Sequence, residues 1–432
     1  MAASCRHSVK KKASSHRRTA KFAQWCKLLV LPGFEMPHGG IMFSVKKGMD
    51  INMGRTAGEV NNKTTYRYYD YSLLFLTLFL VSFGLVMIYS TSSYNAQRLY
   101  GNATYYLERQ ALLAGAGILV MLFVSKIDYR VYFKNLPVIK VKPVIFLYFL
   151  CIGLQIYVLK FGEVINGAKR WIRIGELASF QPSELSKIAV ILFTTYIVQL
   201  APRKLDKFTG FIRVVLFIAP LLGLIVIENF STALVAGVIM VAICFVASKK
   251  KGYFVTSGVL LIALGALLII VEPYRFERIN IWLNVETHEK GYQILQGLYA
   301  IASGGIFGKG LGESMQKLGF IPEAHNDMIF SVICEELGLF GAFALILLFI
   351  LIIWRIFIIA INAPDLTGGL IATGVMSHIA IQVLINIAVV TNTIPSTGIP
   401  LPFISYGGSS VMVILFEMGI VLSISNQIKG EK

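Results

Sequence analysis

The chain has 432 residues, of which 56% are hydrophobic and only 15% are charged; soluble domains carry about a quarter of their residues as charges, so this composition excludes an ordinary soluble domain. The formal net charge of +17 indicates membrane orientation rather than nucleic-acid binding, because many cations precede residue 68 or lie in short segments between apolar runs. The five cysteines form no CxxC pair, so neither a disulfide framework nor a zinc site is indicated.

The first 67 residues are basic and polar and show no sustained hydrophobic period. Their short apolar patch, WCKLLVLPGF, is too brief and too interrupted for the core of a signal peptide. We expect a disordered cytoplasmic tail. A start at Met42, Met49 or Met53 is the alternative, and residues 1–41 would then not be translated.

Residues 68–432 are predicted to form one all-α polytopic membrane domain. Several apolar runs reach the roughly 20 residues that a helix needs to cross a bilayer. The longest connection, residues 273–327, mixes charged and amphipathic segments, and connections of that length are usually functional. The sequence predicts about ten transmembrane helices, at approximately 71–92, 110–125, 143–160, 183–201, 211–227, 231–248, 254–272, 328–358, 368–390 and 407–426.

The distribution of Lys and Arg predicts the orientation of these spans. Cations gather in alternate connections, within residues 126–142, 203–207 and 249–251. These connections are therefore expected to face the cytoplasm, together with both termini. The connection 273–327 is then a large outer loop.

Three cations interrupt this pattern in an outer connection. Lys169, Arg170 and Arg173 lie in the segment NGAKRWIRIGELASF, where the positive-inside rule disfavours them. One interpretation is an interfacial loop with Trp171 as its aromatic anchor. The other is an anion site that faces outward.

Two opposite charges lie in the fourth predicted span. Glu184 and Lys187 are three residues apart and share one face of a helix. Insertion of either charged side chain alone at the centre of a membrane span costs about 2.5–3.5 kcal/mol. They are either a structural ion pair that fixes the helix or the lining of a polar cavity open to the outer leaflet.

More polar residues follow near the eighth and last spans. Asp327 stands where the eighth span begins, at the outer membrane face. His325 lies two residues earlier, but no spacing indicates metal ligation, and we assign it no catalytic role. Glu335 and Glu336, two turns into that span, and Glu417 in the last span are expected to form structural hydrogen bonds between helices.

The segment TNTIPSTGIPLPFISYGGSS connects the last two spans and is rich in Gly and Pro without any charge. Irregular backbone near membrane depth is tolerated only where it is buried in protein or lines a cavity. We therefore expect a re-entrant or tightly folded element beside a site.

Four segments resemble, in order and spacing, the SEDS family of shape, elongation, division and sporulation proteins, the FtsW/RodA/SpoVE group. They are DYSLLFLTLFLVSFGLVMIYSTSS, NGAKRWIRIG with QPSELSK, TGIPLPFISYGGSS, and the long run from GYQILQGLYA to HNDMIFSVICEELGLFG. The resemblance covers residues 69–426. Asn326 and Met328 depart from the Thr and Phe that are frequent in the family. Asn229 replaces a frequent Asp, which puts in doubt any role for a carboxylate at the end of the fifth span.

The resemblance implies a SEDS-type fold and a peptidoglycan glycosyltransferase that polymerises lipid II at the outer face of the bacterial cell membrane. Asp327 matches the essential acid of the family and would be the general base. Lys187 would bind the pyrophosphate of the substrate, and Glu184 would hold Lys187 in position. The further substrate-binding candidates are Lys169, Arg170, Arg173, Gln316, Lys317, Ser405 and Ser409.

The family also implies partners and leaves the role of metals open. We expect a class B penicillin-binding transpeptidase and other division or elongation proteins as partners, and no nucleic acid. No carboxylate cluster typical of a metal site is visible; a divalent cation, Mg²⁺ or Mn²⁺, would enter with the substrate pyrophosphate. A lipid II flippase and a non-catalytic scaffold of the division machinery are the competing hypotheses. Septation, elongation and sporulation are not distinguished by the sequence.

Overall fold

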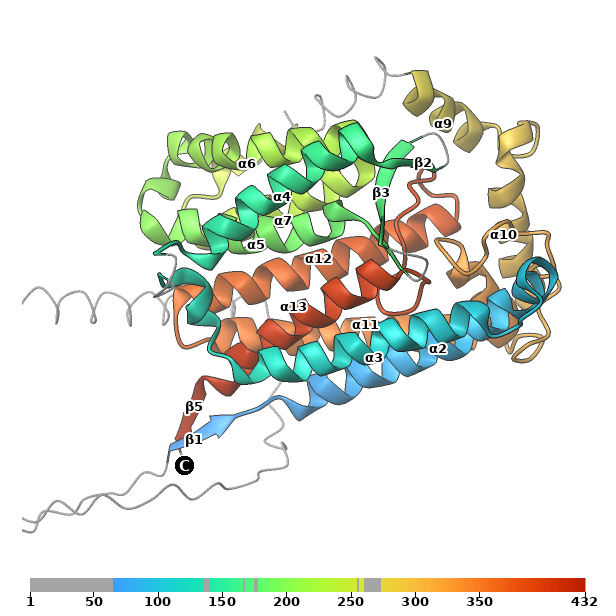
Figure 1. Ribbon diagram of the computed structural model, residues 1–432, viewed down its shortest axis with the longest axis horizontal. Coiled ribbons are helices and arrows are strands. Elements are labelled where there is room, and N and C mark those ends of the chain that lie inside the picture. The colour runs from blue at the N-terminus through green and yellow to red at the C-terminus, as the bar shows by residue number, and fades with distance from the viewer. Residues whose placement is uncertain are drawn as a thin grey trace, which may run out of the picture.

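The computed structural model describes residues 65–135, 140–165, 168–174, 178–254, 256–259 and 273–431. In this part of the chain, nine helices are long and apolar enough to cross a membrane, and they run side by side (Figure 1). The prediction of a multi-pass helical membrane protein is confirmed. Most of the seventh predicted span, 254–272, lies outside the described residues. The nine helices are α2 (Tyr71–Tyr100), α3 (Tyr105–Lys126), α4 (Pro143–Phe161), α5 (Pro182–Leu200), α6 (Phe208–Glu228), α7 (Phe230–Ala247), α11 (Ile329–Asn362), α12 (Leu366–Val390) and α13 (Gly408–Asn426).

The remaining elements are short. The long connection predicted to be the outer loop contains two helices, α9 (Pro273–Leu283) and α10 (Tyr292–Gly304). Single 3₁₀ turns lie at Tyr129–Phe133, Lys204–Asp206 and Glu289–Gly291. The connection between α4 and α5 is a small antiparallel sheet of order β2-β3-β4, formed by Glu163–Ile165, Ala168–Ile174 and Ala178–Phe180. The all-α prediction missed this sheet, although aromatic and β-branched residues such as Trp171 and Ile172 favour strands.

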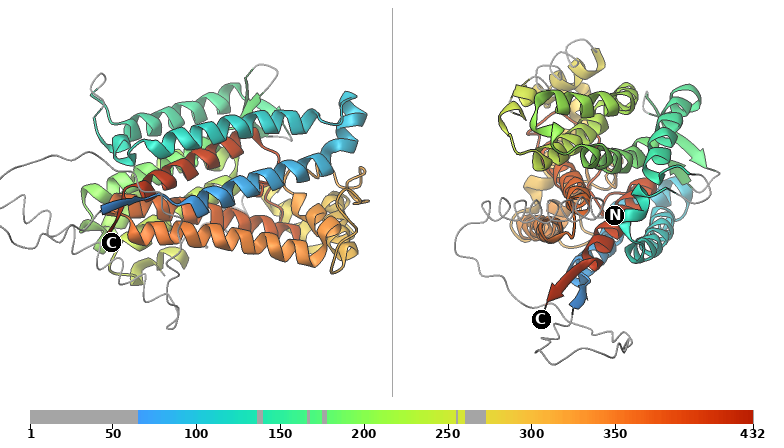
Figure 2. Two further views of the ribbon diagram at one scale, coloured as in Figure 1. Left: turned by 90° about the horizontal axis from the view of Figure 1, so that it is seen from below. Right: turned by 90° about the vertical axis from the view of Figure 1, so that its left-hand side faces the viewer.

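The end of the predicted N-terminal tail has a defined structure. Residues 65–67 belong to β1 (Thr65–Tyr68), which pairs antiparallel with β5 (Ile428–Glu431). Regular structure thus begins at residue 65, three residues before the predicted membrane domain, because these residues pair with the distant C-terminal segment. β1 and β5 lie at one end of the helices, and the loop helices α9 and α10 lie at the other (Figure 2).

Three helices lie at the centre of the bundle. In their most apolar windows, 72% of residues in α5, 61% in α12 and 78% in α13 are buried by the protein itself, against at most 44% in the other spans. A helix enclosed by protein can carry polar side chains that a lipid-facing helix cannot. Glu184 and Lys187 on α5, and Glu417 on α13, are accordingly buried inside the protein.

The helix α11 is interrupted at Gly338, whose φ of 67° and ψ of −170° are not helical. The loop after α10 bonds to the backbone on both sides of the break: Lys309 N donates to Glu335 O at 3.0 Å, and Leu339 N donates to Gly305 O at 2.9 Å. The loop therefore satisfies backbone groups that the interruption leaves without helical partners.

Replacement of Gly338 by alanine is expected to destabilise the protein. A side chain is rarely tolerated at these backbone angles, at a cost of about 1–3 kcal/mol, and a Cβ there would lie 2.3 Å from the amide nitrogen of Gly308. We expect a lower midpoint of thermal unfolding in detergent. Gly115→Ala is the matched control, because no atom lies within 4 Å of its added Cβ; equal midpoints for the two variants would contradict this account.

Candidate active site

Asp327 lies one residue before the end of a run of turns that leads into α11, and it is half-buried. The amide of Asn386 on α12 donates to Asp327 O at 2.8 Å and to Ile399 O at 2.9 Å. A Cβ built on Gly398 would lie 3.9 Å from Asp327 Oδ2. The carboxylate thus lies against the connection between α12 and α13, as expected for an element beside a site.

The surroundings of Asp327 favour its neutral form. Burial raises the pKa of its carboxyl group, the negative charge of Glu323 raises it further, and a hydrogen bond from its own backbone and the nearby Arg278 act in the opposite direction. The Arg278 guanidinium also donates to Ser396 O at 2.6 Å. A carboxylate with a raised pKa is better matched to accepting a proton near neutral pH.

His325 does not share this role. Its ring centroid lies 4.4 Å from that of Tyr106 and 5.4 Å from that of Tyr406, and burial lowers the pKa of the imidazole to about 4. Its carbonyl accepts from Tyr406 N at 2.9 Å. His325 therefore packs as a neutral aromatic residue that joins the Asp327 segment to the connection after α12.

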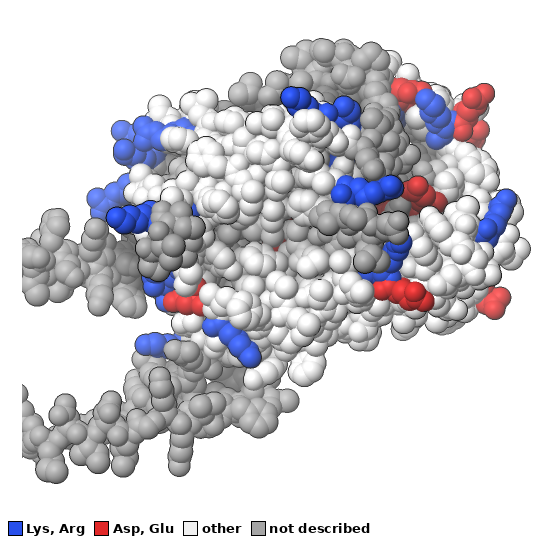
Figure 3. Space-filling model, viewed as in Figure 1, with Lys and Arg blue, Asp and Glu red and all other residues white. Residues whose placement is uncertain are grey.

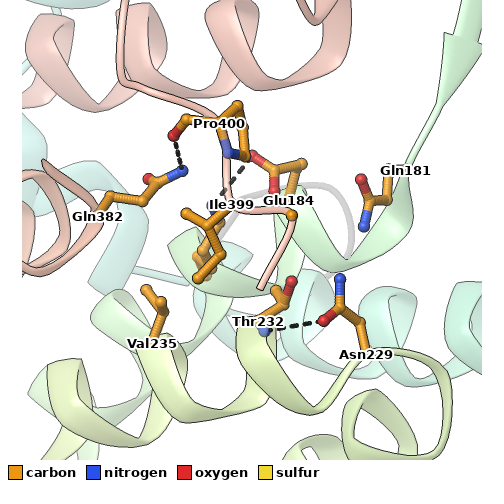
Figure 4. A pocket seen from close by; sticks show the side chains of 10 residues that line it. Gln181, Glu184, Asn229, Thr232, Val235, Gln382, Ile399 and Pro400 are labelled. Atoms are coloured by element: carbon orange, nitrogen blue, oxygen red, sulfur yellow. Dashed lines mark hydrogen bonds and ion pairs between the residues drawn. The ribbon is translucent and has the colours of Figure 1, made fainter. Parts of the chain in front are cut away.

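The second group of polar residues surrounds Glu184 and Lys187, whose ion pair measures 3.0 Å and is almost fully buried. Pro182 occupies the first turn of α5 and orders this segment. Side chains from α5, from α12 and from the start of α7 converge on Ile399 and Pro400 (Figure 4). They enclose a cavity of about 30 Å³, lined by Gln181, Glu184, Lys187, Asn229, Thr232, Val235, Gln382, Gly398, Ile399 and Pro400.

The cavity and Asp327 share one stretch of backbone. Gly398 lines the cavity and is also the residue that approaches the Asp327 carboxylate. Its φ of +67° is a conformation that glycine adopts without strain. The structure therefore brings Asp327, Glu184 and Lys187 to the two sides of residues 398–400, although the sequence separates them by about 140 residues.

Several buried polar atoms in and near this region have no hydrogen-bond partner among the described residues, including Gln382 Oε1, Asn386 Oδ1, Thr397 Oγ1 and Ser409 Oγ. Buried polar atoms are normally paired, and Gln382 lines the cavity, so its amide oxygen is available to a ligand there. Ser405, by contrast, is engaged within its own loop, where its hydroxyl accepts from Leu401 N at 2.8 Å.

Lys169, Arg170 and Arg173, the three cations predicted to face outward, lie on β3. Lys169 and Arg173 are exposed, and Arg170 is half-buried and donates through Nε to Glu228 O at 2.9 Å. Strand β3 thus presents cations at the same end of the bundle as the large outer loop (Figure 1).

Lys317 is engaged in the framework of the protein rather than placed in the cavity. Its ammonium lies 2.7 Å from Glu336 Oε1 and 3.0 Å from Ser90 Oγ on α2, and the whole group is buried. Neighbouring Gln316 donates its backbone N–H to Glu335 Oε2 at 3.3 Å. The structure gives no support to the prediction that Lys317 binds substrate, because its charge is already compensated.

Glu335 was predicted to form hydrogen bonds between helices, and it accepts one from the Ser303 hydroxyl of α10 at 3.3 Å. It also accepts from Lys309 Nζ at 2.7 Å, from Met315 N at 3.2 Å and from the Ser314 hydroxyl, all in the loop after α10. Glu417 follows the prediction and pairs with His378 of α12 at 2.7 Å.

Several residues near the site are absent from the sequence prediction. Gln382 and Asn386 of α12 follow His378 at intervals of four residues, a spacing that places all three on one helix face and could have indicated a polar face. Glu228 is buried one residue before Asn229. With its amide nitrogen facing Glu228, Gln155 donates to both carboxylate oxygens at 2.7 and 2.8 Å. Asn229 itself caps α7 by accepting from Thr232 N at 3.2 Å.

Comparison with known proteins places this arrangement in a family. Residues 71–430 match the sequence model of FtsW, RodA and SpoVE, described as "Cell cycle protein". The chain belongs to the FtsW/RodA/SpoVE family. This confirms the resemblance and its extent.

Relatives and solved structures agree with this assignment. The chain is 39% identical over 376 residues to stage V sporulation protein E of Bacillus subtilis, covering 82% of this chain and 96% of that protein. It is 36% identical to the probable peptidoglycan glycosyltransferase FtsW of Geobacter sulfurreducens, covering 88% of this chain and all of that protein. The crystal structure of RodA from Thermus thermophilus aligns with a TM-score of 0.60 and 26% identity over 83% of this chain and 97% of that one. A chain of a peptidoglycan synthase complex aligns with a TM-score of 0.69 and 28% identity, covering 83% of this chain and 98% of that one.

Proposed function

We propose that this chain is a peptidoglycan glycosyltransferase that polymerises lipid II, with Asp327 as the general base. The observation that carries the proposal is the shared backbone at residues 398–400, which has a carboxylate of raised pKa on one side and a buried cation on the other. Relatives named as glycosyltransferases support it.

The reaction joins two sugars. The acceptor hydroxyl gives its proton to the Asp327 carboxylate while its oxygen bonds to the anomeric carbon of the donor. The bond between that carbon and the pyrophosphate oxygen breaks, and the polyprenyl pyrophosphate leaves with the electron pair. Lys187 and the β3 cations stabilise the negative charge of the leaving group. Glu184 orients Lys187 at 3.0 Å.

The Glu184–Lys187 cavity must widen to admit the substrate. Its volume of about 30 Å³ is roughly that of one water molecule, which is far less than a pyrophosphate needs. The connection between α12 and α13 forms one wall, so substrate binding moves this connection aside. A divalent cation would enter as part of the substrate, since no group of three Asp, Glu, His or Cys side chains is positioned to hold a metal within the described residues.

Incubation of the purified full-length protein with lipid II in detergent tests the proposal. Glycan strands separated on a gel are the expected product. A flippase would give transport of lipid II across vesicles without polymer, and a scaffold would give neither result. Either of those outcomes, with a chain shown to be folded, would overturn the proposal.

The orientation in the membrane is part of the proposal. β1 and β5 lie at the same end of the bundle. On the face shown in Figure 3, Lys and Arg dominate that end, whereas acidic and basic residues mix at the opposite end. Positive charge favours the cytoplasmic side, so both termini would be cytoplasmic and Asp327 would lie at the outer face. Cysteine labelling of an introduced Ser303→Cys from outside intact cells would test the assignment; protection from the reagent would reverse it.

The rate of polymerisation is expected to fall as the pH is lowered. The fall should begin at a higher pH than it would if the base were an exposed aspartate. The base is active when ionised, and burial raises the pKa of Asp327 above its ordinary value of 3.8. Glu323 contributes to this increase, so Glu323→Gln lowers the pKa and moves the acidic limb of the profile to lower pH. Polymerisation rates between pH 4 and 8, measured with both proteins, check the direction; an acidic limb unmoved by Glu323→Gln would count against Asp327 as the base.

A class B penicillin-binding transpeptidase is the proposed partner. The similarity to a chain of a peptidoglycan synthase complex supports it, and a polymerase benefits from a cross-linking enzyme held beside the nascent strand. We expect such a transpeptidase to co-purify with the tagged chain in mild detergent. Its absence, together with activity that does not respond to an added transpeptidase, would argue for an independent enzyme. Other division or elongation proteins are further candidates for the same assay.

A further inference from the structure

A second and larger cavity lies between α4, α5 and α6. Its volume is about 310 Å³, and its walls are almost wholly apolar. This α4–α6 pocket shares no lining residue with the cavity around Glu184 and Lys187, and the proposed reaction does not use it. Its walls include Phe149, Phe193, Ile197, Leu200, Val214 and Phe217.

The pocket opens toward the bilayer. Three of its residues are strongly exposed on the outside of the bundle, with exposed fractions of 63% for Phe149, 63% for Leu200 and 53% for Phe217. All three belong to spans that are long and apolar enough to cross a membrane. An apolar cavity of this kind is poorly hydrated, and its size is at the lower end of the range for ligand sites, about 300–1,000 Å³. A hydrocarbon chain from the surrounding lipid is therefore a better occupant than water.

Cations stand at one end of the pocket. Lys204, in the connection between α5 and α6, and Arg213, in the second turn of α6, line it and are both exposed. Neither side chain has a hydrogen bond or an ion pair within the described residues. Lys142 lies nearby, with its ammonium 2.9 Å from the hydroxyl of the lining residue Tyr196. No acidic residue is among the residues that line the pocket.

This combination has a specific chemistry. Basic pockets between helices at the membrane surface bind the head groups of anionic lipids, and the apolar cavity beside these cations provides room for an acyl chain. We propose that the α4–α6 pocket binds one acidic phospholipid, with an acyl chain between α4, α5 and α6 and the phosphate held by Lys204 and Arg213. Lys142, which is held beside the pocket by its hydrogen bond to Tyr196, adds a third positive charge near the same head group.

Lipid retention by the full-length protein tests this site. The protein is delipidated in detergent and titrated with phosphatidylglycerol or phosphatidylcholine of identical acyl chains, and bound lipids are counted by native mass spectrometry. We expect one tightly retained phosphatidylglycerol and weaker retention of phosphatidylcholine. Lys204→Gln with Arg213→Gln weakens phosphatidylglycerol retention by about fivefold for each cation removed.

Two further variants distinguish lipid binding in the pocket from nonspecific attraction of an anionic lipid to surface cations. Lys249→Gln with Lys250→Gln removes two exposed cations that do not line the pocket, although Lys249 N bonds to Asp206 Oδ1 beside Lys204. This variant is expected to retain phosphatidylglycerol as the wild type does. Val214→Phe fills the cavity and is expected to weaken retention of both lipids.

Three results would overturn the proposal. They are equal retention of the two lipids by the wild type, unchanged retention in the Lys204/Arg213 variant, and equal losses in that variant and the Lys249/Lys250 control. The charge variants alter only exposed side chains and leave the core intact, so they decide the question even if Val214→Phe does not fold.

Discussion

Asp327→Ala is expected to abolish polymerisation of lipid II while leaving the protein folded and inserted. The acceptor hydroxyl is a poor nucleophile until a base removes its proton, and a positioned general base contributes about 10²- to 10⁴-fold in rate. Because Asp327 is half-buried and lies outside the helix α11, its loss removes no helical hydrogen bond. Gel analysis of glycan strands made by the purified variant measures the effect.

Two variants make this experiment specific. Asp327→Asn keeps the shape of the side chain but accepts no proton, so it should be as inactive as the alanine variant. Glu313→Ala removes an exposed carboxylate from the same outer loop and should keep normal activity. Near-normal polymer yield from either Asp327 variant would exclude this carboxylate as the base.

The double substitution Glu184→Met with Lys187→Leu is expected to give a stable, inserted and inactive protein. Removal of one partner strands a buried charge, at a cost of about 3–5 kcal/mol, whereas removal of both leaves an apolar face of similar volume. Each single variant should therefore unfold at lower temperature than the double variant. If Lys187 binds the pyrophosphate, the double variant should be as stable as the wild type but should remain inactive. Thermal unfolding and polymer yield, measured on the three variants, separate the two roles.

A second buried ion pair provides the matched control. Lys317→Leu with Glu336→Met removes a pair whose charges are 2.7 Å apart and which lines neither cavity. This double variant should recover both stability and activity relative to its singles. Substantial polymer from the Glu184/Lys187 double variant would show that this pair, too, is structural.

Much of the fold follows from local patterns. Apolar runs of sufficient length predicted each of the nine spans that the structure describes, with shifted ends. The helix α2, for example, continues to Tyr100, eight residues past the predicted end; hydropathy reports the membrane boundary and not the end of the helix. The break at Gly338 could not be predicted, because it depends on backbone donated by a loop some 30 residues earlier in the chain.

The sequence predicts a site residue where a charged side chain lies in an otherwise apolar segment, because its insertion into the membrane costs free energy. Asp327, Glu184 and Lys187 stand out because a charge at membrane depth needs a reason. The partners of Lys317 could not be predicted, since Glu336 and Ser90 lie 19 and 227 residues away. The proximity of Gly398 to Asp327 depends in the same way on tertiary structure, and no spacing in the sequence indicates it.

The interruption of α11 lets one loop hold two helical segments at once. Lys309 N and Gly310 N donate to Glu335 O and Glu336 O before the break, and Leu339 N and Phe340 N donate to Gly305 O and Ile306 O after it. Asp327 lies two residues before the first segment. A protein that binds this loop would therefore act on both segments of α11 together, and a movement of the first segment would be transmitted to Asp327.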